Sequence, residues 1–375
     1  GIWPLKGAGK PLPKLKTSFT FAKPSLTHMA LVALQRSGKL RYVCSQNVDG
    51  LHLRSGIPRE MLAELHGNCF AERCPKCNRE YIRDFEIETV GFRRTGRSCS
   101  VEGCTGRLRD HILDWEDALP EDELEASEDQ SSEADLTICL GTSLQITPAC
   151  DLPLRTVKSG GKLVIVNLQK TPKDKSAHLL IRGKADEVMR GLLQRLDTPV
   201  PPFIRRDCVV LLFYQTPPRG SKAERASFTV QACSPQGQTL PLPILTSVTI
   251  SFPDNEALKA AVIRKAPFTA CRAAAAPGKL RVRFEVEFAQ GLGVEEPRVQ
   301  VDAEFNLLGA AELKALRCGT AARNGQQANA TTRFSTAHLL NAQVQEVHVT
   351  TQSVYYTESD KTGAIEESPN KKVKR

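Results

Sequence analysis

Residues 136–143 read Leu136-Thr137-Ile138-Cys139-Leu140-Gly141-Thr142-Ser143, a nearly continuous apolar run that ends in small and hydroxyl side chains. Two similar runs, residues 40–45 and residues 162–166, also end in polar residues. A helical pattern at residues 26–35 precedes the run at residues 40–45, and another at residues 186–196 follows the run at residues 162–166. Nearly continuous apolar strands that alternate with helices predict an α/β fold with a parallel, Rossmann-like sheet covered on both faces. In such sheets, ligands bind at the carboxyl ends of the strands.

Four cysteines form two short pairs between the first and second of these strands. Two residues separate Cys74 from Cys77, four separate Cys99 from Cys104, and twenty-one separate the two pairs. This spacing predicts one tetrahedral zinc ion with four thiolate ligands. A closed thiolate shell leaves no position for water or substrate, so we expect a structural zinc in an inserted module of about residues 70–112.

The second half of the chain has a different pattern. Residues 280–288 alternate strictly between apolar and charged side chains, and residues 248–252 alternate in the same way. Such alternation predicts strands with one buried face, and a sandwich is one arrangement that buries it. Prolines at the end of the first half mark a boundary. We therefore expect one domain over residues 1–203 and a smaller β-rich domain over residues 204–349.

The composition is that of a globular protein with a moderate positive charge. The 375 residues carry a formal charge of +9. No apolar run is long enough to predict a membrane-spanning helix, so we expect no membrane association. Residues 350–375 are polar and predict a disordered tail that ends in Lys371-Lys372-Val373-Lys374-Arg375. This basic cluster fits a nuclear localisation patch and a solubilising end about equally well.

One histidine near the cysteines is the candidate catalytic residue. His66 lies in Glu64-Leu65-His66-Gly67-Asn68, downstream of the polar turn Gln46-Asn47-Val48-Asp49-Gly50. Histidine titrates near neutral pH and suits a general base, although a single histidine is more often a hydrogen-bonded structural residue. Asn47 and Asp49 could hydrogen-bond the hydroxyl groups of a ligand or could form an Asx-turn, and both interpretations stay open.

Five motifs, in this order along the chain, resemble those of the sirtuin family. They are Ser45-Gln46-Asn47-Val48-Asp49-Gly50-Leu51-His52, Glu64-Leu65-His66-Gly67-Asn68, the four cysteines, Gly141-Thr142-Ser143-Leu144 and Val166-Asn167-Leu168-Gln169. Sirtuins are NAD-dependent protein-lysine deacylases. Residues 113–120 and 142–146 resemble the nuclear, chromatin-associated class IV branch, and the β-rich half resembles the C-terminal region of plant nuclear members. The resemblance is strong over residues 1 to about 203 and loose beyond them.

The resemblance implies an NAD-dependent protein deacetylase that acts on acetylated lysines, on histone tails in particular, and yields nicotinamide, O-acetyl-ADP-ribose and free lysine. His66 is then the general base, with Asn47 and Asp49 as the other catalytic residues. The implied NAD contacts are Trp3, Gln46, Asn47, Asp49, His66, Gly141, Thr142, Ser143, Asn167, Gln169 and Ala185. Asp114 and Trp115 resemble the lining of the acyl-lysine channel. The implied cofactors are NAD and one structural Zn²⁺, and we expect a nuclear, chromatin-associated monomer.

One part of the family pattern is missing from this sequence. Sirtuins carry an upstream Gly-Ala-Gly segment and an Asp-Phe-Arg loop that cradle the pyrophosphate and nicotinamide side of NAD. This chain begins at Gly1-Ile2-Trp3, and its own Gly7-Ala8-Gly9 is followed by prolines that oppose a helix. We therefore expect an N-terminally truncated form of the enzyme. The alternatives are an NAD-incompetent, zinc-stapled scaffold that binds chromatin, and a protein mono-ADP-ribosyltransferase.

Overall fold

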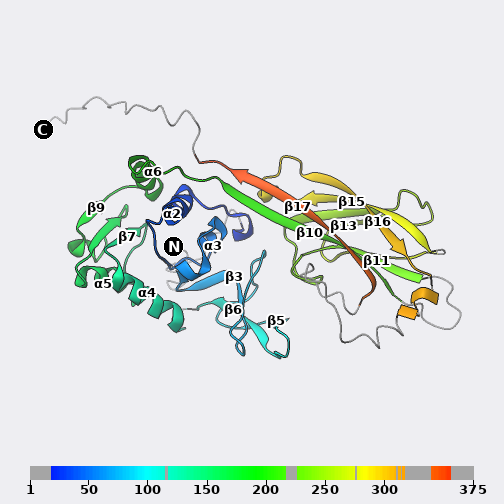
Figure 1. The fold of residues 1–375 in the computed structure, drawn as a ribbon, viewed down its shortest axis with the longest axis horizontal. Helices are drawn as coiled ribbons and strands as arrows, with labels where there is room; N and C mark the ends of the chain where they lie inside the picture. Colours follow the sequence, from blue (N-terminus) through cyan, green and yellow to red (C-terminus); the bar gives the residue numbers. More distant parts are fainter. Residues whose placement is uncertain are drawn as a thin grey trace, which may run out of the picture.

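The computed structural model describes residues 18–114, 117–216, 226–274, 277–309, 311–313, 315–316 and 339–355. An α/β part with a projecting antiparallel module lies beside an antiparallel β-sandwich (Figure 1). The predicted fold class is therefore confirmed. Trp3, the Gly7–Gly9 segment, Trp115 and the basic cluster at residues 371–375 lie outside the described residues.

The α/β part contains two parallel sheets. One pairs β1 (Val43–Ser45) with β2 (Leu62–Glu64), and the other has the order β7 (Leu136–Leu140), β8 (Lys162–Val166), β9 (Leu179–Ile181). β7 and β8 have the bounds that their apolar runs predict. β1 is shorter than the predicted strand at residues 40–45, because its partner β2 is itself only three residues long.

The β7–β8–β9 sheet is covered unequally by the rest of the chain. Its residues Cys139, Leu163 and Ile165 pack with Leu154 and Val157 of α5 (Leu152–Lys158). On the other face, Ile138 and Leu179 lie in one row of the register and remain 37% and 52% exposed. On this same face Leu140 packs against the cluster that contains Ala30 and Leu193, and Val166 is buried. Within the described ranges, the second face is therefore covered only in part.

Four further α-helices complete the α/β part: α2 (Leu26–Arg36), α3 (Leu51–Ser55), α4 (Glu121–Glu133) and α6 (Ala185–Arg195). Leu26, Ala30 and Leu34 of α2 pack against Met189 and Leu193 of α6. Short 3₁₀ helices are η1 (Phe19–Phe21), η2 (Arg59–Met61), η3 (Ala149–Asp151), η4 (Asp174–Ser176) and η5 (Gln290–Leu292), the last of these in the sandwich. None of the described helices is both long and apolar enough to span a membrane.

The cysteine-bearing module is a small antiparallel sheet. Its strands are β3 (Gly67–Arg73), β4 (Glu80–Ile82), β5 (Arg94–Ser98) and β6 (Arg107–Ile112), in the order β4-β3-β6-β5. The fully buried carboxylate of Glu72 receives Arg83 Nε and Arg97 Nε, both at 2.6 Å. Two charged donors in a buried position compensate much of the cost of removing that carboxylate from water.

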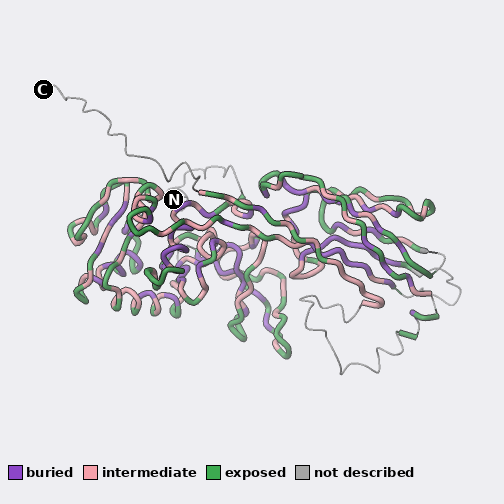
Figure 2. The backbone as a smooth tube through the Cα atoms, turned by 45° about the horizontal axis from the view of Figure 1, so that its top comes forward, coloured by how far each residue is buried: buried purple, intermediate pink, exposed green. Residues whose placement is uncertain are grey.

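The sandwich consists of two four-stranded sheets. One has the order β14 (Phe268–Ala274), β11 (Ala226–Cys233), β10 (Phe203–Thr216), β17 (Leu340–Ser353); the other has the order β13 (Ala261–Ile263), β12 (Leu245–Ser251), β15 (Gly278–Phe288), β16 (Arg298–Leu307). Phe213, Phe228 and Phe284 are fully buried between the sheets, where Figure 2 shows the buried backbone. The strict alternation at residues 280–288 appears as the buried and exposed faces of β15. β17 continues to Ser353, so residues 350–353, expected in the tail, pair with β10.

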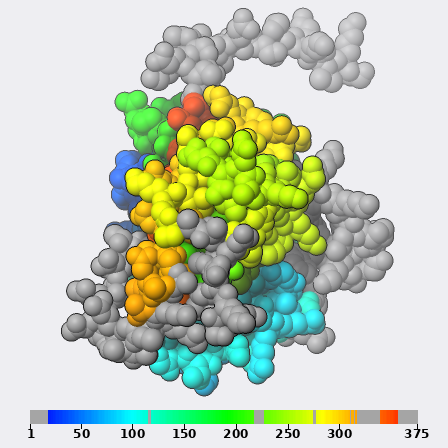
Figure 3. Space-filling model, turned by 90° about the vertical axis from the view of Figure 1, so that its right-hand side faces the viewer, coloured from blue at the N-terminus to red at the C-terminus, as the bar shows by residue number. Residues whose placement is uncertain are grey.

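The two parts are in direct contact. Arg205 Nη1 of β10 donates to the carbonyl of Thr20 at 2.7 Å, and the hydroxyl of Tyr355 donates to the carbonyl of Pro24. Gln236 Nε2 donates to the carbonyl of Ile82 in the cysteine module at 3.1 Å. Figure 3 shows the sandwich next to the cyan atoms of this module. The chain therefore leaves the α/β part in β10 and returns to it after β17.

Candidate functional site

The predicted histidine lies where β1 and β2 end. The amide of Leu65 donates to the carbonyl of Ser45 at 2.9 Å, and the amide of Cys69 donates to the carbonyl of Val48 at 2.8 Å. These bonds fasten the turn at residues 46–50 to the turn that carries His66. The half-buried His66 ring lies against the backbone carbonyl of Gln46. Burial lowers the pKa of His66, and the Gln46 carbonyl opposes this shift. The ring is therefore neutral at pH 7 and able to accept a proton.

Asn47 and Asp49 occupy the turn beside this histidine. Asp49 Oδ1 accepts the amide of Leu51 at 3.0 Å, which is the Asx-turn interpretation, and Gly50 (φ 65°) begins α3. Asn47 is exposed, and its own amide donates to Ser45 Oγ at 3.1 Å. The structure therefore shows that Asp49 forms an Asx-turn. Contacts of Asn47 and Asp49 with a ligand stay predictions.

A buried carboxyl that the sequence did not single out supports this turn. Glu64 is 3% exposed, and Asn68 Nδ2 donates to its two carboxyl oxygens at 3.0 and 2.9 Å. Asn68 Oδ1 in turn accepts the amide of Phe70 at 2.8 Å. A Cβ added to Gly50 would lie 2.9 Å from Asn68 Oδ1, so only glycine leaves room for this pair beneath the turn. Burial raises the pKa of Glu64 to about 7, against the opposing effects of Asn68 and Arg59.

The second set of predicted residues lies at the ends of β7 and β8. The amide of Gly141 donates to the carbonyl of Val166 at 2.9 Å, so the two strand ends are adjacent. Thr142 Oγ1 accepts the amide of Leu144 at 3.3 Å, and Asn167 Nδ2 donates to the carbonyl of Gln169 at 3.0 Å. Both side chains therefore stabilise their own turns. Ser143 and Gln169 are exposed, and Ala185 is the first residue of α6.

Apolar packing connects the ends of β1 and β2 with the ends of β7 and β8. Leu65, next to His66, is fully buried in a cluster with Ala149 and Leu152, which follow the Gly141–Ser143 turn. The amide of Leu113 donates to the carbonyl of His66 at 3.2 Å, which brings the following residue, Asp114, to the histidine turn. The structure thus joins Gln46, Asn47, Asp49, His66 and Asp114 in one region and Gly141, Thr142, Ser143, Asn167 and Gln169 in another. Trp3 and Trp115 are outside the described residues.

Two half-buried histidines near Asp49 each have one buried ring nitrogen that no described residue hydrogen-bonds. The rings of His28 and His52 have centroids 4.7 Å apart. His28 Nε2 and His52 Nδ1 are buried and have no hydrogen-bond partner among the described residues. Burial lowers the pKa of both histidines, that of His52 to about 4. Orphaned nitrogens close to a carboxylate and a carboxamide fit a polar ligand with hydroxyl groups, as the ribose side of NAD is.

The four cysteines have the geometry of a zinc site. Their sulfur atoms all lie within 4.8 Å of one another, with Cys74–Cys104 and Cys77–Cys99 at 3.6 Å. A tetrahedron with zinc–sulfur bonds of about 2.3 Å has sulfur–sulfur edges of roughly 3.8 Å. A Cβ on Gly106 would lie 2.2 Å from the sulfur of Cys74, so glycine is required there. The cluster therefore fits one structural zinc, as predicted.

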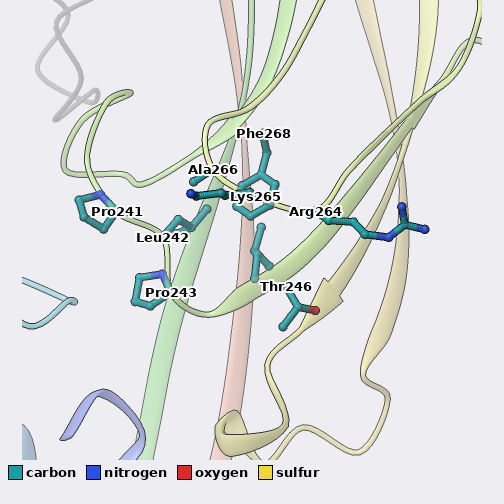
Figure 4. Close-up of a pocket in the computed structure, with 9 residues that line it drawn as sticks. Pro241, Leu242, Pro243, Thr246, Arg264, Lys265, Ala266 and Phe268 are labelled. Carbon is teal, nitrogen blue, oxygen red and sulfur yellow. The ribbon is translucent and has the colours of Figure 1, made fainter. Parts of the chain in front are cut away.

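One pocket of the described residues lies away from the strand ends. It has a volume of about 500 Å³ and lies in the sandwich, between the Pro241–Pro243 segment and the Arg264–Ala266 segment (Figure 4). None of the predicted site residues lines it. The candidate site is therefore located by the hydrogen bonds at the strand ends and not by this pocket.

Comparisons with known proteins agree on one family. The sequence profile described as "Sir2 family" matches residues 13–148. NAD-dependent protein deacetylase SRT1 of Arabidopsis thaliana is 48% identical over 307 residues, which are 82% of this chain and 64% of that protein. NAD-dependent protein deacetylase sir-2.4 of Caenorhabditis elegans is 34% identical over 205 residues, which are 53% of this chain and 70% of that protein. A solved structure described as "Sir2 bound to acetylated peptide" is 35% identical, with a TM-score of 0.40 over 48% of this chain and 73% of that chain. The chain spans slightly less than two thirds of the length of SRT1.

Proposed function

The chain belongs to the Sir2 family, and from this we propose that it is the catalytic part of an NAD-dependent protein deacetylase. The observation that carries the proposal is the position of the His66 ring, which lies against the Gln46 carbonyl at the carboxyl ends of β1 and β2, next to the turn of Asn47 and Asp49. A base, a carboxamide and a carboxylate in one turn region suit proton removal from a sugar hydroxyl.

Each part of the site has a proposed role in this reaction. NAD, when bound, supplies the acceptor for the acetyl group. Asn47, Asp49 and Gln46 bind and orient its nicotinamide-side ribose, and His66 accepts a proton from a ribose hydroxyl. The adenosine side would be held at the ends of β7 and β8 by Gly141, Thr142, Ser143, Asn167, Gln169 and Ala185. Cys74, Cys77, Cys99 and Cys104 would hold the zinc that stabilises the module, and Asp114, which follows β6, would line the lysine channel.

Acetylated protein lysines are the proposed substrates. The names of the relatives, which describe protein deacetylases, support this class. We propose histone tails as the physiological form and the nucleus as the location. The basic cluster at residues 371–375 supports the nuclear assignment, and a protein of this kind would act as a chromatin-associated monomer.

The test is an acetyl-lysine peptide assay read by mass spectrometry, with and without NAD. We expect NAD-dependent deacetylation that falls by at least about 100-fold in His66→Gln, because general-base catalysis contributes about 10²–10⁴-fold. His178→Gln is the matched control: His178 is exposed, and glutamine keeps an acceptor for the amide of Leu163. Deacetylation that needs no NAD, or that survives in His66→Gln, would contradict the proposal. ADP-ribose transferred to protein would favour the transferase alternative, and peptide binding without turnover would favour the scaffold.

A further inference from the structure

A second group of metal-ligand side chains lies in the sandwich, far along the chain from the four-cysteine cluster. It consists of Cys208 on β10 and Glu346 and His348 on β17, whose ligand atoms all lie within 4.8 Å of one another. We propose that these three side chains bind a second zinc ion, with the fourth coordination position left to water or another exchangeable ligand. This proposal is independent of the proposed enzymatic function.

The strand register brings the three residues together. Cys208 lies directly opposite His348 in the antiparallel β10–β17 pair, and Glu346 lies two residues before His348 in β17, on the same face. Val347 and Val349 point the other way, into the sandwich core. Cys208 instead borders the outer-face cluster that contains Val210 and Leu212. The backbone of two hydrogen-bonded strands therefore holds the ligands on one surface.

The chemistry of the set is that of a zinc site with one open position. Thiolate, imidazole and carboxylate are the three ligand types that proteins use for Zn²⁺, and three protein ligands leave one position for water. Ligand atoms around tetrahedral zinc lie roughly 3.3–3.8 Å apart, and His348 Nε2 and Glu346 Oε2 are already 3.3 Å apart. The side chains of His348 and Glu346 are 69% and 47% exposed, so they have room to rotate towards the thiol.

A metal at this position would act on the connection between the two parts of the molecule. β17 is the outer strand of its sheet, and β10 is its partner. Two residues after β17 ends at Ser353, Tyr355 contacts the carbonyl of Pro24 in the α/β part, and β10 contacts the same part through Arg205. Zinc that bridges Cys208 and His348 would therefore fasten the outer strand and hold both connecting segments in place.

The first test is a zinc titration of the full chain against a chromophoric chelator, with ZnCl₂ alone as the probe. We expect two zinc ions per chain, of which one is lost in both Cys208→Ser and His348→Gln. Removal of a direct ligand should weaken this site by at least about 10-fold, since loss of an outer-shell partner already costs about 10–100-fold. Cys271→Ser is the matched control, because Cys271 is an exposed thiol of the same sheet that belongs to neither cysteine-containing cluster. It should keep both ions.

The second test is hydrogen exchange of β17 in the presence and absence of added zinc. Zinc should slow exchange across Glu346–His348 in the parent chain and in Cys271→Ser but leave it unchanged in Cys208→Ser. Unchanged exchange in the buried strand β15 of each variant shows that the sandwich is folded. A single zinc ion per parent chain under saturating zinc, or two ions in every variant, would overturn the proposal. Zinc protection of β17 that persists without Cys208 would overturn it as well.

Discussion

The replacement Glu64→Gln should change how the stability of the protein depends on pH. Burial raises the pKa of Glu64 from 4.5 to about 7, so the folded chain keeps this proton to a higher pH than the unfolded chain. Its contribution to stability is therefore fully present below pH 4.5 and is lost as the pH rises through 7. At about 1.4 kcal/mol per pKa unit, the whole loss is about 3 kcal/mol, of which roughly 2–3 kcal/mol falls between about pH 5 and pH 8.

The assay is urea unfolding of the parent chain and of Glu64→Gln over this pH range. Glutamine does not titrate, so the variant should gain roughly 2–3 kcal/mol relative to the parent as the pH rises. His28, His52, His66 and His111 have lowered pKa values and titrate in both proteins, so they cancel in the difference. Glu60→Gln, at an exposed position, should follow the parent. Parallel curves for the parent and Glu64→Gln, within about 0.5 kcal/mol, would refute the reasoning.

Three further changes test other parts of the structure. Cys74→Ser should lower zinc content by one ion per chain and unfold the cysteine module, because metal binding energy is folding energy there; full zinc content with an unchanged Tm would count against it. Gly67→Ala should destabilise the histidine turn and reduce turnover, because its Cβ would lie 1.6 Å from the carbonyl oxygen of His111; unchanged urea stability would contradict this. Phe284→Ala should cost about 3–5 kcal/mol in urea unfolding, and a loss under about 1 kcal/mol would show that the sandwich core is loosely packed.

The sequence predicted those elements whose pattern is purely local. β7 and β8 have the expected bounds, and α2 and α6 agree within one residue, since continuous apolar runs and helical periodicity need no partner to be recognised. The zinc cluster was equally predictable, because the spacing of its cysteines along the chain identifies it. The contact of the His66 turn with Gln46 was not among these predictions, because it depends on β2, a strand of only three residues.

Features that depend on distant residues were not predictable in this way. Residues 116–135 contain ten Asp or Glu and no Lys or Arg, a composition that predicts a solvated loop or short helix. In the structure, α4 buries Glu123, which pairs with Arg59 and accepts the amide of Glu64. That contact belongs to the packing that buries Glu64, and no local pattern encodes it. Cys208 and His348 face each other only through the register of β10 and β17, two strands far apart in the sequence.

The most direct test of the central claim is the stoichiometry of products from NAD and an acetyl-lysine peptide. Parallel reactions would use the parent chain, His66→Gln, and the parent fused to a sirtuin glycine-rich segment ahead of Gly1. We expect equal amounts of nicotinamide, free lysine and O-acetyl-ADP-ribose, with all three lost in His66→Gln. Free lysine without nicotinamide, equal turnover in His66→Gln, or no product from either the parent or the fused chain would contradict the proposed chemistry.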